Sequence, residues 1–437
     1  MTFRRWFVVM TLVLGVAMRT DAVVTGSIFG PGSEAFPIAV MPLKDAGGDA
    51  GGALGREFAR VLSRDLDLSG YFRLVDPKTF VEDSRTAGVT AETTDFVGWA
   101  AIGAAEVVKG TVAVSGDTIT VEVRLFDVAE RRDVPQVSRR FSGARADLPR
   151  MAHRMADGIL ELMTGERGPF DSKITLTSTR GGPLKEIYTY TFDQTAPTKV
   201  TNVRSLVVAP SWRPDLRAIL FTAYSEHQPK LFQVDLATRG VSRLIAGGGT
   251  WIGGAWSPDG TRLLAVREEA GNSDIYLVDR SGAVVRRLTD HWGIDVSPSW
   301  APDGRRFVFC SARGGAPQIY AMSVDGGEPR RVSRLGNYNT SPSWSPKGDY
   351  IAYAMRGGGG FQIVVAPADG SGAGRAITSS GSNEDPSWAP DGRYLVFSST
   401  RGRGRKLWLA DRDGRVQKEL TTGAGDDTSP NWSRRMD

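Results

Sequence analysis

The sequence predicts a multidomain protein: a small N-terminal α/β domain followed by an all-β six-bladed β-propeller that the C-terminal strand closes. Three observations predict this fold: a repeat of fixed period, a last repeat that breaks off early, and a mixture of helical and strand patterns before the repeats begin. The expected segments are a signal peptide at 1–22, an extended tail at 23–33, the α/β domain at 34–166 and the propeller at 170–437.

A tryptophan recurs every 44 residues (256 − 212 = 44), at Trp212, Trp256, Trp300, Trp344, Trp388 and Trp432. A period of about 40–45 residues is the length of one four-stranded propeller blade. In the third repeat, Pro302-Asp303-Gly304 makes the turn after the tryptophan, because proline presets φ, aspartate caps the backbone and glycine accepts a positive φ. We expect the tryptophans to wedge between blades as part of the core.

The last repeat ends after its first strand, around Trp432. The missing strands have a counterpart upstream, because residues 172–203 resemble a blade without its leading tryptophan. They share the letters STRG, at 178–181, with a complete repeat at 399–402. An open sheet edge invites unwanted pairing, so we expect a composite sixth blade in which 172–203 supplies three strands and the C-terminus supplies the fourth.

The first 22 residues have the layout of a secretory signal peptide: Arg4 and Arg5, an apolar run at 6–18, and small residues that end at Ala22. The run is short for a membrane span, and a retained N-terminal anchor is the alternative. The pattern between 34 and 166 is mixed. It predicts strands at 36–43 and 71–75, a hairpin that turns at 115–117, short and closing helices, and a long helix with Leu54, Phe58, Val61, Leu62 and Leu66 on one face.

Composition argues against several functions. The formal net charge is +5 and becomes +3 when the signal peptide, with three arginines and one aspartate, is removed (5 − 3 + 1 = 3). That charge is spread along the chain, which disfavours nucleic acid as a partner. The three histidines are scattered, the sequence has no GxSxG motif, and the glycine-rich stretch at 47–55 lacks phosphate-loop spacing. We therefore expect no catalytic residue, no metal site and no cofactor, and a buried role for the single cysteine, Cys310.

Polar side chains recur five and three residues before the tryptophan, where the chain leads into each innermost strand. These loops open at one mouth of the channel, so equivalent positions should form polar rings there. The expected rings are Asp295, Asn339, Asn383 and Asp427 at the first position and Ser297, Ser341, Asp385 and Ser429 at the second. The second repeat has Trp251 instead, which we expect to be an exposed interface anchor. The alternative for each residue is a local cap for backbone groups.

The order of these parts, with the tail VVTGSIFG, the strand FPIAVMPL and the W-[SA]-P-D-G repeats, resembles the TolB family of periplasmic Tol-Pal components. The resemblance implies a non-enzymatic, monomeric scaffold that supports outer-membrane integrity and constriction during cell division. It implies that the outer-membrane lipoprotein Pal docks on the ring residues and that the inner-membrane protein TolA contacts the first domain and the tail. The tail residues are Val23, Val24, Thr25, Gly26, Ser27, Ile28 and Phe29.

A second class of function stays open at this point. A secreted propeller enzyme acting on carbohydrate or peptide would use carboxylates in the channel. Acids with raised pKa in a deep, closed pocket would favour the enzyme. A shallow mouth with mixed polar and apolar walls would favour docking.

Overall fold

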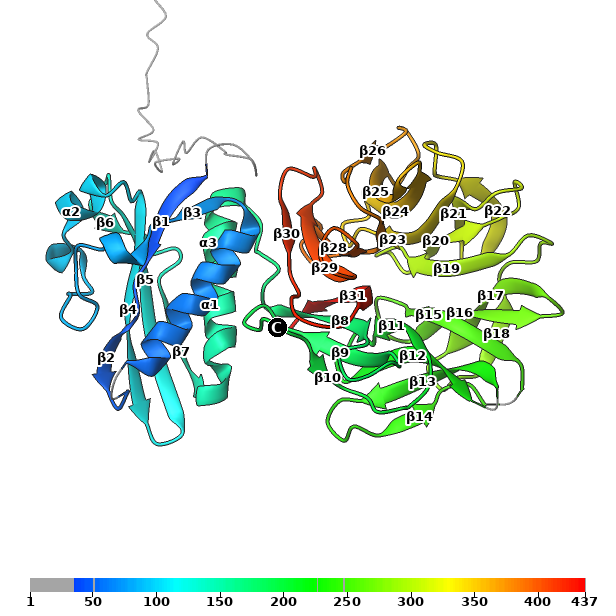
Figure 1. Ribbon diagram of the computed structural model, residues 1–437, viewed down its shortest axis with the longest axis horizontal. Coiled ribbons are helices and arrows are strands. Elements are labelled where there is room, and N and C mark those ends of the chain that lie inside the picture. Colours follow the sequence, from blue (N-terminus) through cyan, green and yellow to red (C-terminus); the bar gives the residue numbers. More distant parts are fainter. Residues whose placement is uncertain (1–34, 50–51, 226, 247, 437) are drawn as a thin grey trace, which may run out of the picture.

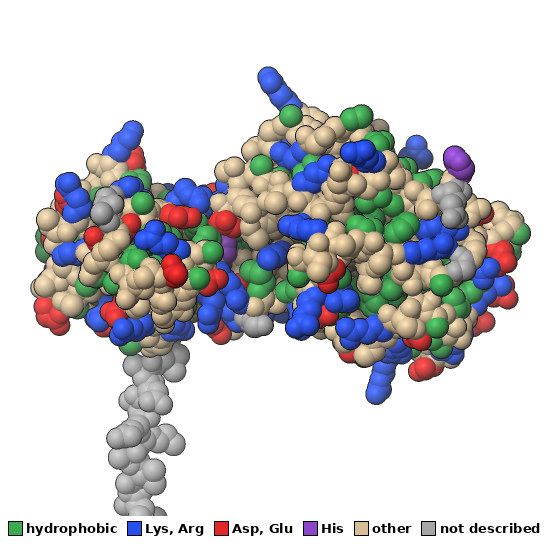
Figure 2. All heavy atoms as spheres, turned by 90° about the horizontal axis from the view of Figure 1, so that it is seen from below, with side chains coloured by type: hydrophobic (Ala, Val, Ile, Leu, Met, Phe, Trp, Pro, Cys, Tyr) green, Lys and Arg blue, Asp and Glu red, His purple; other side chains and the backbone are tan. Residues whose placement is uncertain are grey.

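The computed structural model describes residues 35–49, 52–225, 227–246 and 248–436. They form two lobes joined at a waist (Figures 1 and 2). An α/β lobe is followed by a six-bladed propeller, which confirms the predicted fold class. The predicted signal peptide (1–22) and tail (23–33) lie outside the described residues. No helix of the described residues combines the length and apolar character needed to cross a membrane.

The N-terminal lobe contains β1 (Phe36–Val40), β2 (Lys44–Gly47), α1 (Ala53–Ser69), β3 (Phe72–Leu74), η1 (Pro77–Thr79), η2 (Ala91–Thr93), α2 (Phe96–Ala101), β4 (Glu106–Ser115), β5 (Thr118–Asp127), β6 (Arg132–Asp133), β7 (Arg139–Ala144), η3 (Arg145–Asp147) and α3 (Leu148–Thr164). Its strands make one mixed sheet in the order β3-β1-β4-β5-β6, with β2 added beside β4 and β7 beside β5. Strand β1 runs parallel to both of its neighbours.

Helices α1 and α3 lie between this sheet and the propeller (Figure 1). Helix α1 buries Phe58, Leu62 and Leu66 on one side, as the spacing of its apolar residues predicts. It ends at Gly70, whose φ of 73° is a conformation that glycine adopts without steric cost. Helix α3 ends in the same way at Gly165.

The larger lobe is a ring of six four-stranded antiparallel sheets, numbered here as blades 1 to 6. Blade 1 has β11 (Val207–Trp212), β12 (Ala218–Ser225), β13 (Gln228–Asp235) and β14 (Val241–Arg243); blade 2 has β15 (Thr250–Trp256), β16 (Arg262–Glu269), β17 (Asn272–Asp279) and β18 (Val284–Arg287); blade 3 has β19 (Asp295–Trp300), β20 (Arg306–Ser311), β21 (Gln318–Ser323) and β22 (Gly326–Arg331). Blade 4 has β23 (Asn339–Trp344), β24 (Tyr350–Gly357), β25 (Gly360–Pro367) and β26 (Arg375–Ala376); blade 5 has β27 (Asn383–Trp388), β28 (Tyr394–Ser399), β29 (Lys406–Asp411) and β30 (Gln417–Glu419).

Blade 6 is the composite blade that the sequence predicts. It joins the C-terminal strand β31 (Asp427–Arg435) to β8 (Ser172–Ser178), β9 (Glu186–Tyr190) and β10 (Thr198–Lys199). Strands β31 and β8 are antiparallel, with Trp432 opposite Ile174. The two ends of the propeller therefore close the ring through backbone hydrogen bonds.

The periodic tryptophans lie between blades, as predicted, and are each 5–7% exposed. The indole Nε1 of Trp300 donates to the carbonyl of Ala255 in the preceding blade over 2.8 Å. Trp388 makes the equivalent bond to Ser343 over 3.0 Å. These side chains therefore seal the contacts between neighbouring blades, and Cys310 is buried as well.

One hydrophobic cluster extends across both lobes. Leu62 of α1 and Leu160 of α3 belong to the same buried cluster as Tyr190 and Trp432 of the propeller. The hydroxyl of Tyr394 donates to the carbonyl of Ser69 over 2.8 Å across the junction. Because the contact is apolar and buried, it holds the lobes as one unit.

Candidate functional site

Every innermost strand of the ring contains a β-bulge shortly before its tryptophan. The residue three positions before the tryptophan has a positive φ in each blade: Ala209 (52°), Gly253 (64°), Ser297 (53°), Ser341 (49°), Asp385 (55°) and Ser429 (49°). A bulge changes the direction in which a strand presents its side chains. Here it turns these six positions toward the central channel.

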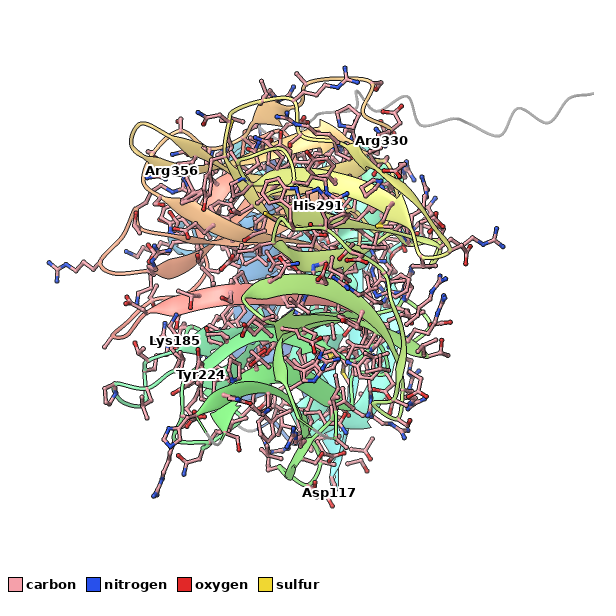
Figure 3. The ribbon with its side chains drawn as sticks, turned by 90° about the vertical axis from the view of Figure 1, so that its right-hand side faces the viewer. Asp117, Lys185, Tyr224, His291, Arg330 and Arg356 are labelled. Atoms are coloured by element: carbon pink, nitrogen blue, oxygen red, sulfur yellow. The ribbon has the colours of Figure 1, made fainter. Side chains whose placement is uncertain are left out.

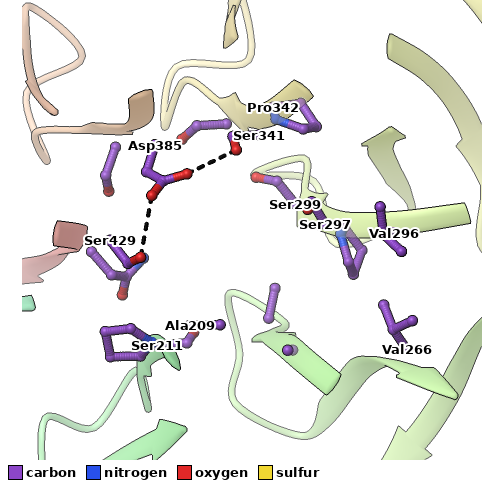
Figure 4. Close-up of a pocket in the computed structure, with 18 of the residues that line it drawn as sticks. Ala209, Ser211, Val266, Val296, Ser297, Ser299, Ser341, Pro342, Asp385 and Ser429 are labelled. Carbon is purple, nitrogen blue, oxygen red and sulfur yellow. Dashed lines mark hydrogen bonds between the residues drawn. The ribbon is translucent and has the colours of Figure 1, made fainter. Parts of the chain in front are cut away.

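These positions line a hollow of about 290 Å³ at one mouth of the channel (Figure 4). Prolines and small polar residues form most of its wall. Asp385 is the one acidic side chain among its described lining residues. Its carboxylate accepts hydrogen bonds from Ser341 Oγ over 2.8 Å and from Ser429 Oγ over 3.2 Å. The predicted ring of Ser297, Ser341, Asp385 and Ser429 is thus present in the channel.

The environment of Asp385 perturbs its titration. Burial raises the pKa of this carboxyl above its ordinary value, and the nearby Glu384 acts in the same direction. The two serine hydroxyls and Arg405 oppose the increase. Glycoside hydrolysis generally needs a pair of carboxylates across the scissile bond. The described lining of this hollow offers one, Asp385.

The other predicted ring, five residues before each tryptophan, does not reach the surface. Asp295, Asn339, Asn383 and Asp427 are all 0% exposed. Asn339 of blade 4 donates to Gln318 Oε1 of blade 3 over 2.7 Å, whereas Asp295 pairs with Arg313 of its own blade over 3.0 Å. The bulge separates these residues from the channel-facing positions. The two asparagines donate to local carbonyls, those of Leu335 and Ser380, as the alternative interpretation of local caps expects. The two aspartates instead pair with arginine side chains, those of Arg313 and Arg180.

The prediction for Trp251 is wrong in its placement. This side chain is 2% exposed and lies edge-on to Tyr276, with ring centroids 5.7 Å apart. Arg267 stacks over the same indole at 5.8 Å. The next residue, Ile252, faces the hollow instead and is 37% exposed.

Sequence reasoning missed a different tryptophan. Trp292 is 74% exposed, the largest exposed fraction among the exposed large hydrophobic residues of the described chain. It lies in the loop between blades 2 and 3. Hydrogen bonds fix this loop on both sides, from Asn272 Nδ2 to the His291 carbonyl over 2.7 Å and from the Ala312 amide to the Ile294 carbonyl over 3.1 Å. The sequence did give one indication of this exposure, because Trp292 falls outside the 44-residue spacing of the buried tryptophans.

Trp292 belongs to a group of exposed apolar residues at the hollowed mouth, which we call the apolar arc. Its members come from blade 1, blade 2 and the loop into blade 3: Leu206, Tyr224, Ile252, Trp292 and Ile294. In Figure 3, Tyr224 lies on the same side of the propeller as Lys185 and Arg356 of two other blades. Exposed apolar residues gathered on one face mark an interaction surface.

The opposite end of the channel has a different character. A hollow of about 540 Å³ there is lined by the periodic tryptophans and the turn prolines. On this side Lys347 and Arg393 both bind Glu166 of the N-terminal lobe, over 2.5 and 3.1 Å. Among the described contacts between the lobes, none involves a residue that lines the smaller hollow. The apolar arc and the ring therefore stay accessible.

The fold and the site define a class of protein, a two-domain β-propeller protein with an open, mixed polar and apolar channel mouth. Comparison with known families identifies its family. Residues 160–436 match the model of the TolB beta propeller domain, and residues 22–134 match that of the TolB amino-terminal domain. The chain belongs to the TolB family.

Curated relatives agree with this assignment. The Tol-Pal system protein TolB of Syntrophotalea carbinolica is 35% identical over 216 residues, which is 49% of this chain and 50% of that one. That of Geobacter sulfurreducens is 39% identical over 188 residues, or 43% and 42% of the two chains. The chain thus spans about half the length of the curated relatives it matches. The crystal structure of TolB from Acinetobacter baumannii shares the fold, with a TM-score of 0.79, 24% identity, and coverage of 92% and 98%.

Proposed function

We propose that this chain is a periplasmic scaffold that docks Pal over the hollowed mouth of its propeller and contacts TolA through Val23–Phe29 and the N-terminal lobe. It would be exported with a cleaved signal peptide, act as a monomer, and reach both membranes through its partners. In this role it links the inner and outer membranes, and so supports outer-membrane integrity and constriction during cell division.

The observation that carries the Pal proposal is the continuity of the apolar arc with the ring. Ile252 belongs to the arc and also lines the hollow, so the two form one surface. A large exposed aromatic at the centre of a docking surface supplies much of the binding energy when it becomes buried. The hydrogen-bonded loop presents Trp292 without further ordering, which lowers the entropic cost of binding.

Titration calorimetry with purified Pal from the same organism tests this proposal. The protein is prepared from residue 23 onward, as the parent and as the double variant Trp292→Ala with Ile294→Ala. We expect the double variant to bind at least about 30-fold more weakly, because truncating a central aromatic anchor lowers the binding free energy by about 2 kcal/mol or more.

The matched control is Val284→Ala with Val285→Ala. These two side chains are also exposed and apolar, but they lie on the outermost strand of blade 2, away from the hollow. Their loss should leave the affinity within about twofold. Binding of Pal that is equally strong in all three proteins would reject this surface, and no binding to the parent would reject Pal as the partner.

A further inference from the structure

The six channel-facing positions carry different side chains, so opposite sides of the hollow differ in charge and in size. Asp385 belongs to blade 5 and Gly253 to blade 2, so they face each other across a ring of six. Blade 1 contributes Ala209. The hollow is therefore acidic on one side. On the opposite side the channel-facing positions, Gly253 and Ala209, carry no large side chain, and Ile252 of the apolar arc lines the wall beside them.

The carboxylate of Asp385 has unused acceptor capacity. An ionised carboxylate offers about four lone-pair sites, and Ser341 and Ser429 occupy two of them. Ser297, Ser299 and Asn431 add further polar atoms to the wall. These groups converge on a volume of about 290 Å³, roughly ten times the share of one water molecule in the liquid. A single long side chain fits such a volume.

We infer that the hollow receives one cationic side chain, a lysine or an arginine, from the protein that docks on the apolar arc. The inference rests on the proposed docking of Pal and names what the hollow contributes to it. The cation enters past Gly253 and pairs with Asp385, while the hydroxyls accept its remaining N–H groups. Arg405 does not occupy this place, because it pairs with Glu384 over 2.9 Å.

A divalent metal ion fits the described walls less well. Hard divalent cations take six or more oxygen ligands, usually with several carboxylates. The described residues contain no cluster of three or more acidic, histidine or cysteine side chains that could hold a metal. One carboxylate with several hydroxyls matches a monovalent ammonium or guanidinium group, which brings one charge and many donors.

The test compares Pal affinity of the parent with that of Asp385→Asn, which keeps the shape and removes the charge. We expect the variant to bind 10- to 100-fold more weakly. The matched control is Asp426→Asn, because Asp426 is exposed on the loop that leads into β31 and does not line the hollow. The control should change affinity by less than about threefold, and equal melting temperatures would exclude unfolding.

A second probe tests the cation site without Pal. n-Butylammonium, a mimic of the lysine side chain, is titrated into the parent and into Asp385→Asn and followed by saturation-transfer NMR. If Pal binds the parent and Asp385→Asn equally well, the inference is overturned while the proposed function stands. If Pal does not bind the parent, the proposed function fails, and the probe decides alone: saturation that requires Asp385 supports the cation site, and its absence overturns it.

Discussion

Trp432 and Ser172 lie 260 residues apart in the chain and are joined by a hydrogen bond in which the indole Nε1 donates to the serine Oγ over 2.7 Å. At the other end of the same strand, Asp427 accepts a hydrogen bond from Ser178 Oγ over 2.7 Å. Trp432 belongs to the buried core that both lobes share. The C-terminal strand is therefore a structural part of the whole molecule.

Deleting residues 426–437 should open the ring. The edge of β8 loses its partner and the shared core loses Trp432, and removal of a buried tryptophan side chain alone costs about 3–5 kcal/mol. We expect the melting temperature to fall by at least about 10 °C, measured by scanning calorimetry. The control is Arg434→Ala, an exposed residue of the same strand, which should shift melting by no more than about 2 °C. A deletion variant that melts like the parent would contradict this closure.

His153 of α3 joins the two lobes through charge. Its Nδ1 lies 2.6 Å from Asp65 Oδ2 in α1, and its Nε2 lies 3.6 Å from Asp193 Oδ1 in the propeller. Burial alone would lower the pKa of this imidazole, but the two carboxylates outweigh burial and raise the pKa to about 10. The resulting stabilisation is fully present below the unfolded pKa of about 6.5 and is lost as pH rises through about 10.

We therefore expect His153→Ala to lower the free energy of unfolding by about 3 kcal/mol at pH 6, and by clearly less at pH 10.5. Urea unfolding at both pH values measures the difference. Glu161→Ala is the control, because Glu161 is exposed on the same helix, and it should have little effect at either pH. A loss from His153→Ala that is equal at the two pH values would show that the imidazole acts through packing alone.

Glu106 of β4 should make the protein less stable in alkali. This side chain is 7% exposed and lies opposite Asp127 in the sheet. Burial and the charge of Asp127 raise its pKa to about 8. The stability linked to its neutral form is present below the unfolded pKa of about 4.3 and is lost as pH rises through about 8.

Glu106→Gln supplies a permanently neutral group of the same shape. We expect it to raise the free energy of unfolding by about 1–3 kcal/mol at pH 9 and to change it little at pH 5. Urea unfolding at the two pH values provides the measurement, with the more exposed Glu122→Gln on β5 as the control. A Gln variant that is less stable than the parent at pH 9 would refute this assignment.

The affinity for Pal should depend on pH through Asp385. Burial raises the pKa of this carboxyl, with Glu384 adding to the increase and Arg405 opposing it. Lowering the pH protonates the group and removes its attraction for a cation. We expect the affinity of the parent to fall between pH 7.5 and pH 5, and that of Asp385→Asn to change much less. Parallel pH profiles for the two proteins would argue against a role for the charge.

The sequence predicted the fold well because its repeat is regular. The 44-residue spacing of the tryptophans identified equivalent positions in every blade, and the shared STRG letters revealed the composite blade. These features depend on local turns and on periodicity, which a sequence displays directly. The long helix with Leu54, Phe58 and Leu66 on one face was also predicted, because apolar residues at helical spacing are visible in the sequence.

The candidate site was predicted only in part, because a β-bulge decides which side chains face the channel. In a regular strand, residues five and three before the tryptophan share a face. The bulge breaks that alternation, so Ser297 reaches the channel while Asp295 is buried in its blade. The same geometry buries Trp251. The exposure of Trp292 depends on how a loop between blades is held, which periodicity does not show.

Hydrogen exchange of the parent with and without Pal tests docking at the hollowed mouth most directly. We expect Pal to slow amide exchange at 204–206, 250–254 and 288–294, which carry most of the apolar arc and the adjacent ring position Gly253. Exchange at the turns 258–260 and 302–304, at the opposite end of the channel, should stay unchanged. Slower exchange at those turns, with no change at the hollowed mouth, would contradict docking at this mouth.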